Sequence, residues 1–130
     1  MIKVLHEDEW ITVSFDEARR LVRYTRSSVP YGDAKNLDRS LGGAGALAAQ
    51  IPRGMKLLVD LRRAPPRNDD AFEAKTSLAL AEFLPRFAKH ATLMSTAVGK
   101  LQAARMARAR GVTARAFEDE AAALAYLDGD

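Results

Sequence analysis

MKLLVDL, the stretch from Met55 to Leu61, is an apolar run with one acid near its end. The turn Pro52-Arg53-Gly54 precedes it. Runs of this kind are typical of strands in parallel sheets, which are buried on both faces, whereas strands with one wet face alternate apolar and polar residues. The stretch therefore predicts a central parallel strand, and the other expected elements can be arranged around it.

Upstream of this strand the sequence predicts a hairpin and then a helix. Residues 11–15 alternate apolar and polar side chains, and a second short β-rich run covers residues 21–26. Asp33 can then cap a helix that extends to about Gln50. The glycines inside this helix either allow close packing on the sheet or mark a break, because each costs about 1 kcal/mol in a helix interior.

Downstream of the central strand, helices and strands alternate. The expected elements are a helix at Ala71–Leu84, a strand at Ala91–Ser95, a basic helix at Ala97–Arg110, a strand at Val112–Phe117 and a helix at Glu118–Leu127. The order β-β-α-β-α-β-α-β-α predicts an α/β fold. We expect a mostly parallel sheet of about five strands, an antiparallel N-terminal hairpin at its edge, and about four flanking helices.

The composition is that of one domain in a reducing compartment. The 130 residues are 48% apolar, which is ordinary for a chain with a single core, so residues 1–130 are expected to form one domain. The absence of cysteine excludes disulfides, thiolate zinc sites and cysteine nucleophiles. The N-terminus has no apolar signal region, and the longest uncharged stretch, Ser40 to Pro52, is too short to span a bilayer. We therefore expect a cytoplasmic protein without a membrane span.

The charge balance gives little indication of a partner. The chain carries 20 Lys and Arg against 17 Asp and Glu, a formal net charge of +3. A nucleic-acid module normally gathers its cations on one face with interleaved aromatic residues, whereas these arginines are spread from Arg19 to Arg115, so a nucleic-acid partner is not expected.

The loop after the central strand is the first candidate site, because open α/β sheets bind ligands at the carboxyl ends of their strands. One interpretation is a docking or anion-sensing loop. The other is that Asn68 or Asp69 only caps the next helix while the arginines are solvated or pair with acids. In the docking interpretation the partner-binding residues are Arg62, Arg63, Arg67, Asn68, Asp69 and Asp70.

Asp60, the polar group at the end of the central strand, has three conceivable roles. It could be a base, a metal ligand or an acceptor for N–H groups of the following loop. The first two roles need a second titratable group, and only Asp69 or Asp70 across the same loop are near in sequence. The acceptor role is therefore favoured.

A second strand end carries Thr96, Gly99 and Lys100, which superficially resemble a phosphate loop. The first glycine and the hydroxyl after the lysine of such a loop are missing, so an ordinary helix cap is favoured and anion binding is the alternative. His6 and His90 lie far apart with no metal-ligand spacing around them, and no serine stands in a Gly-x-Ser-x-Gly elbow. The sequence thus predicts no catalytic residue, no metal site and no cofactor.

The hairpin, the strand ending in Asp60-Leu61, the six-residue loop and the capped helix together resemble the STAS domain of bacterial anti-sigma factor antagonists. More narrowly, the chain is similar to the small bacterial SpoIIAA-like proteins of this family, over nearly its whole length in element order. In the family, Asp-Ser-Ser/Thr-Gly opens the helix after the loop, and a partner kinase phosphorylates a hydroxyl there. Spacing from Asp60 places Asn68, Asp69, Asp70 and Ala71 on these four positions, so both hydroxyl positions carry acids.

The resemblance implies a non-enzymatic regulatory module that docks a protein partner. A carboxylate cannot be phosphorylated by a serine kinase, so the module would lack the phosphoswitch or carry a permanent negative charge. The alternative, from the distant likeness of the SpoIIAA-like group to CRAL-TRIO domains, is a carrier of a small apolar or lipid-like ligand. An enzyme is the third hypothesis and would need a pocket that joins Asp60 to a second titratable group. A homodimer also stays open.

Overall fold

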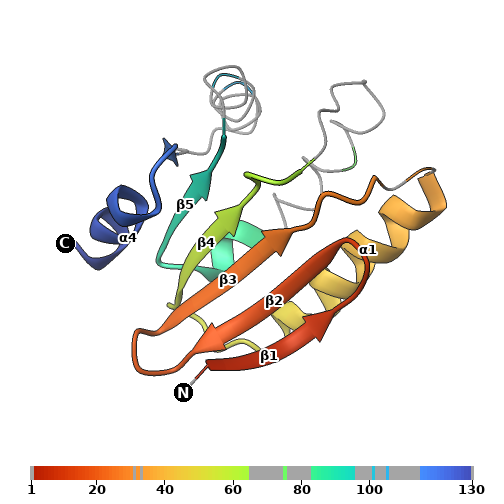
Figure 1. Ribbon diagram of the computed structural model, residues 1–130. Coiled ribbons are helices and arrows are strands. Elements are labelled where there is room, and N and C mark those ends of the chain that lie inside the picture. Colours follow the sequence, from red (N-terminus) through yellow and green to blue (C-terminus); the bar gives the residue numbers. More distant parts are fainter. Residues whose placement is uncertain are drawn as a thin grey trace.

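The computed structural model describes residues 2–30, 32, 34–64, 75, 83–95, 101, 105 and 115–129 (Figure 1). Within this part of the chain, six strands form one sheet and two α-helices and a short 3-10 helix accompany it. In chain order the elements are β1 (Ile2–Glu7), β2 (Ile11–Asp16), β3 (Leu21–Arg26), α1 (Ala34–Ala48), β4 (Lys56–Asp60), the 3-10 helix η1 (Leu84–Arg86), β5 (Lys89–Leu93), β6 (Ala116–Phe117) and α4 (Glu120–Asp128).

The sheet follows the chain order, β1-β2-β3-β4-β5-β6. The first three strands pair antiparallel, and β3 to β6 pair parallel. Leu58 of β4 lies opposite Arg23 of β3 and Ala91 of β5, so β4 is a central parallel strand, as the MKLLVDL stretch predicts. The α/β class and the antiparallel N-terminal hairpin, now β2 and β3, are likewise confirmed.

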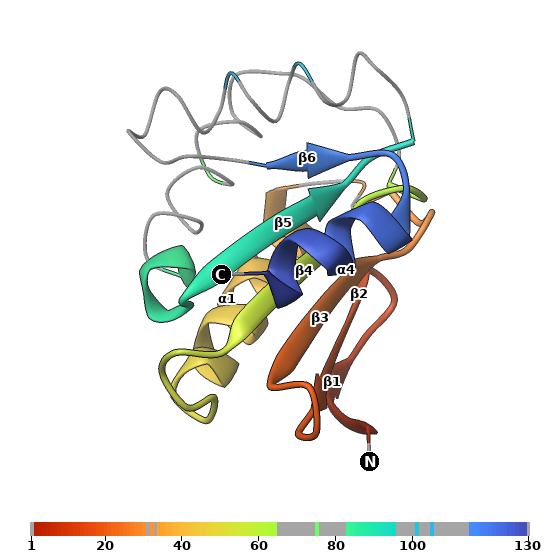
Figure 2. The same cartoon turned by 90° about the vertical axis from the view of Figure 1, so that its left-hand side faces the viewer.

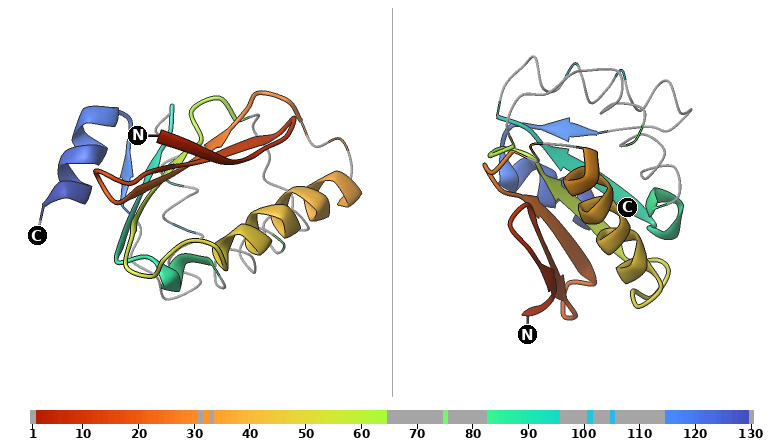
Figure 3. Two further views of the ribbon diagram at one scale, coloured as in Figure 1. Left: turned by 90° about the horizontal axis from the view of Figure 1, so that it is seen from below. Right: turned by 90° about the vertical axis from the view of Figure 1, so that its right-hand side faces the viewer.

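Each face of β4 belongs to a different core cluster. Leu57 packs in the cluster that includes Leu37 and Leu47 of α1, and Leu58 packs with Ala123 and Leu127 of α4. Figure 3 shows α1 and α4 on opposite sides of the sheet, and Figure 2 shows α4 across the strands β4 to β6, which it contacts. The two faces of one central strand are thus covered by two separate helices.

The expectation of about five strands was wrong by one, because β1 was not predicted. Its side chains carry little burial signal: Ile2 and Val4 are mostly exposed, and only Leu5 packs partly against the core. A β-bulge between Val4 and His6 also breaks the alternation along the strand. The predicted hairpin is therefore not the edge of the sheet, since β1 lies outside it.

Four flanking helices are not supported by the described residues, which contain the α-helices α1 and α4. Most of the helices expected at Ala71–Leu84 and Ala97–Arg110 lies outside the described residues. Leu84 itself belongs to η1, where Pro85 stands in the first turn. The strand expected at Ala91–Ser95 begins two residues earlier, at Lys89. Neither α-helix in the described part of the chain has the length and hydrophobicity that a membrane-crossing segment needs.

Polar contacts at both ends hold α4 antiparallel to the strands. At its start the Asp119 side chain accepts a hydrogen bond from the main-chain N–H of Ala122. At its end the Lys89 Nζ donates to the carbonyls of Tyr126 (2.7 Å) and Gly129 (3.0 Å), where a cation complements the helix dipole. These contacts place the first turn of α4 at the carboxyl ends of the strands.

We expect Leu58→Ala to lower the free energy of unfolding by about 3 kcal/mol, because Leu58 is fully buried and its removal leaves a cavity under α4. Urea denaturation followed by circular dichroism measures this loss. Val4→Ala is the matched control, since Val4 is 60% exposed and its truncation should cost no more than about 0.5 kcal/mol. Equal losses for both variants would contradict the arrangement of the core.

Candidate functional site

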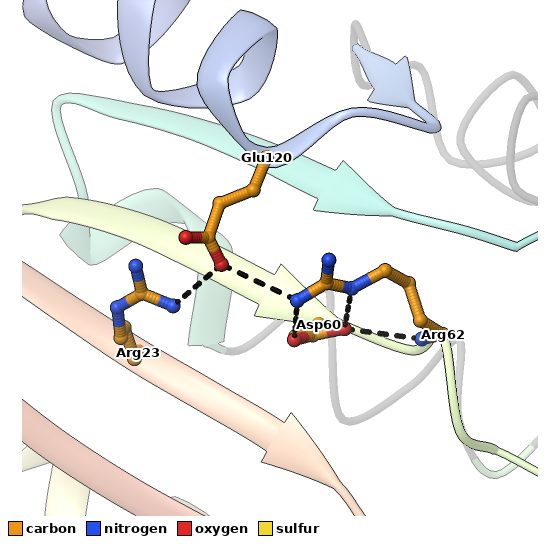
Figure 4. Close-up of polar contacts among 4 residues, drawn as sticks. All are labelled: Arg23, Asp60, Arg62 and Glu120. Carbon is orange, nitrogen blue, oxygen red and sulfur yellow. Dashed lines mark hydrogen bonds and ion pairs between the residues drawn. The ribbon is translucent and has the colours of Figure 1, made fainter.

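Four charged side chains meet near the carboxyl end of β4, beside β3 and on the face that α4 covers (Figure 4). Asp60 ends β4, and Arg62 follows it by two residues. Arg23 comes from the neighbouring strand β3, and Glu120 is the first residue of α4. Asp60 and Arg62, which are close in the sequence, are thus joined to two residues that are distant from them in the sequence.

Asp60 is bound entirely by its own loop. The side chain accepts hydrogen bonds from the main-chain N–H of Arg62 (3.1 Å), from its Nε (3.0 Å) and from its Nη2 (2.8 Å). The loop is also attached to the sheet, because the N–H of Leu61 donates to the carbonyl of Leu93, and the N–H of Ala64 donates back to the carbonyl of Leu61. Asp60 therefore acts as the acceptor that fixes the turn of residues 61–64.

The surroundings keep Asp60 ionised. Burial alone would raise the pKa of this carboxyl group, since Asp60 is only 8% exposed. The hydrogen bonds from Arg62 and the charges of Arg62 and Arg23 outweigh burial, and the pKa of Asp60 lies below its usual value. In the same pair, the hydrogen bond to Asp60 raises the pKa of Arg62. A carboxylate with a low pKa is a weak general base at neutral pH.

Glu120 joins the two guanidinium groups. Its Oε1 accepts from Arg23 Nη1 at 3.2 Å and from Arg62 Nη2 at 3.3 Å, and its side chain is 38% exposed. The network consists of two cations and two anions, so its charges balance. It ties the start of α4 to β3 and to the loop after β4.

The sequence-predicted residues are only partly described. Asp60 and Arg62 lie together in the network, and Arg63 is the exposed residue beside them, with no ion pair to any other described residue. Neither Arg23 nor Glu120 was predicted, since an arginine in a strand and an acid in the first turn of a helix are ordinary in a sequence. Outside the described residues lie Arg67, Asn68, Asp69, Asp70, Thr96, Gly99 and Lys100.

Both histidines lie in strands of the sheet, where the contacts described for them are structural. His6 Nε2 lies 2.9 Å from Asp8 Oδ2, and the other oxygen of Asp8 accepts from the main-chain N–H groups of Trp10 and Ile11. This arrangement fixes the corner between β1 and β2. His90 is half-buried in β5, and burial lowers its pKa. Among the described residues, no group of three or more His, Cys, Asp or Glu could hold a metal ion.

The sequence matches no family model, and comparisons with curated proteins and with solved structures return no match.

We expect Asp60→Asn to lower the free energy of unfolding at neutral pH by about 2 kcal/mol, because the amide keeps the shape but loses the charge that Arg62 binds. The folded-state pKa of Asp60 is depressed, so its contribution is present above its ordinary pKa of 3.8 and is lost as the pH falls through the folded-state value. The difference between the wild type and the variant should therefore shrink below about pH 4.

Urea denaturation at a series of pH values measures this difference. Glu118→Gln is a suitable control, because Glu118 is exposed, lies two residues before Glu120 and is not among the four residues of the network. A constant difference between wild type and Asp60→Asn down to acid pH would contradict the role given to the Asp60 charge.

Proposed function

We propose that this chain is a non-enzymatic, STAS-like regulatory module of the cytoplasm that docks a protein partner at the carboxyl edge of its sheet. The observation that carries the proposal is the turn after β4. Asp60 fixes its main chain and binds Arg62, and Arg63 is left exposed at its tip. A loop that is rigid before binding loses little conformational entropy when a partner docks.

The state of Asp60 supports binding over acid–base catalysis at this edge. Three hydrogen bonds from Arg62 occupy the carboxylate, and its pKa is lowered, so it is poorly suited to take a proton from a substrate. Its one further described neighbour of opposite charge, Arg23, is bound to Glu120. The groups at this edge therefore serve better as a fixed polar surface than as reacting groups.

The order of elements supports the STAS-like part of the proposal. Antiparallel strands precede β4, and β4 ends in Asp60 at the loop where the family carries its regulatory motif. In the proposal the partner-binding residues are Arg62, Arg63, Arg67 and the residues 68–70. With acids at positions 69 and 70, docking would not be switched off by phosphorylation.

We expect Arg63→Glu to reduce recovery of the partner at least about tenfold, since an exposed charge at the centre of a docking surface is reversed. The tagged protein is used as bait in its own cells, and co-purified proteins are quantified by mass spectrometry. The control is Arg39→Glu, the same change at an exposed arginine of α1. Both variants should keep the wild-type urea midpoint.

The result that supports the proposal is a protein recovered with the wild type and Arg39→Glu but lost with Arg63→Glu. Recovery of the same proteins by all three baits would contradict it. Native mass spectrometry of gently purified protein tests the alternative, because a persistently bound lipid-like molecule would favour a carrier of apolar ligands instead.

A further inference from the structure

The opposite edge of the sheet, where the parallel strands begin, gathers cations that are distant in the sequence. Three segments lie side by side there: residues 17–20, 53–56 and 86–89 (Figure 1). The N–H of Lys56 donates to the carbonyl of Arg20 (3.0 Å), and the N–H of Gly54 donates to the carbonyl of Arg86 (3.1 Å). We call this surface the amino edge; its cations are Arg19, Arg20, Arg53, Lys56, Arg86 and Lys89.

The acids at the amino edge are fewer than the cations. In the described part of this edge they are Asp16, Glu17 and Asp128, so positive charge is in excess. The excess arises from the fold, because neighbouring parallel strands start about 5 Å apart and bring their preceding turns together.

Most of these cations already stabilise the fold. Arg19 Nη2 lies 2.8 Å and Lys56 Nζ 3.5 Å from the carboxylate of Asp128. The side chains of Lys89 and Arg86 donate to main-chain carbonyls, that of Arg86 to Ile51 at 3.1 Å. Carbonyls do not cancel a positive charge, so both side chains still contribute to the field of this edge.

Arg20 and Arg53 are available for a partner. Both are exposed, and neither forms an ion pair with a described residue. Arg20 also has a φ of 53°, a left-handed conformation that glycine or asparagine adopts at lower cost. An arginine at this position therefore brings no advantage to the turn itself.

The chemistry of the amino edge favours carboxylates. A guanidinium binds a carboxylate through two parallel hydrogen bonds. Two guanidiniums that form no ion pair with a described residue suit a short acidic segment, whereas binding to nucleic acid depends on neutralising a longer row of phosphates. None of the three segments carries an exposed large apolar side chain that could enter a bilayer.

We propose that the amino edge binds an acidic segment of a protein partner, with Arg20 and Arg53 each binding a carboxylate. The surface is separate from the carboxyl edge, which lies at the other end of the same strands, so the inference goes beyond the function proposed above. A domain with two such edges joins two partners, or two parts of one.

A labelled polyglutamate peptide, followed by fluorescence anisotropy at low ionic strength, tests this proposal. The double variant Arg20→Asn/Arg53→Gln should bind the peptide about tenfold more weakly or worse, since two bidentate contacts are lost. Asparagine tolerates the left-handed conformation, so this variant should keep the wild-type urea midpoint. The matched control, Lys35→Gln/Arg39→Gln at two exposed positions of α1, loses the same charge elsewhere and should bind within about twofold of the wild type.

Carbodiimide coupling of the peptide to lysine amines then locates the contact. Coupling at Lys56 or Lys89 is expected, and coupling confined to Lys35 or Lys75 would overturn the proposal. Equal weakening of the control double variant would also overturn it, because the peptide would then sense only net charge. Preferential binding of a single-stranded oligonucleotide at the same salt would overturn the assignment to an acidic protein.

The two proposals can fail separately. If Arg63→Glu loses a partner and the peptide does not bind at the amino edge, the docking function stands and this inference fails. If peptide binding depends on Arg20 and Arg53 but no partner depends on Arg63, this inference stands and the docking function fails.

Discussion

Leu57 and Leu58 are neighbours in β4, and each is fully buried on a different face of the sheet. This double burial is the constraint on which the rest of the structure depends. A strand with two apolar faces must be covered on both, and α1 and α4 supply those covers. The same constraint places polar groups at the ends of β4, because its middle has no room for them.

The cover supplied by α4 is small and depends on polar contacts at its ends. Its fully buried apolar side chains are Ala123 and Leu127, so hydrophobic contact alone fixes the helix weakly. Glu120 binds Arg23 and Arg62 at one end, and Asp128 binds Arg19 and Lys56 at the other. The carboxyl edge is thereby part of the fold as well as a candidate docking surface: a partner that moved Arg62 would also weaken the attachment of α4.

The sequence predicted what is local and missed what the fold brings together. Residues 55–61 predict the central strand because burial on both faces leaves a signal in consecutive residues. The edge strand β1 leaves none, since Ile2 and Val4 face solvent. The pairing of Asp60 with Arg62 spans two residues and could be foreseen, whereas Arg23 and Glu120 are 97 residues apart and meet only through the order of the strands.

The distribution of charge follows from the same strand order. The arginines look evenly spread along the sequence, yet parallel pairing of β3, β4 and β5 brings Arg20, Arg53 and Arg86 to one edge and Arg62 and Arg63 to the other. At the carboxyl edge the network of Asp60, Arg62, Arg23 and Glu120 is internally neutral, so the docking proposed there rests on the shape of the turn and on Arg63. Among the described residues of the amino edge cations exceed acids, and the attraction of these cations for an anionic partner acts over a distance that salt shortens. The same strand order thus gives the carboxyl edge a fixed shape with balanced charges and gives the amino edge a positive electrostatic field.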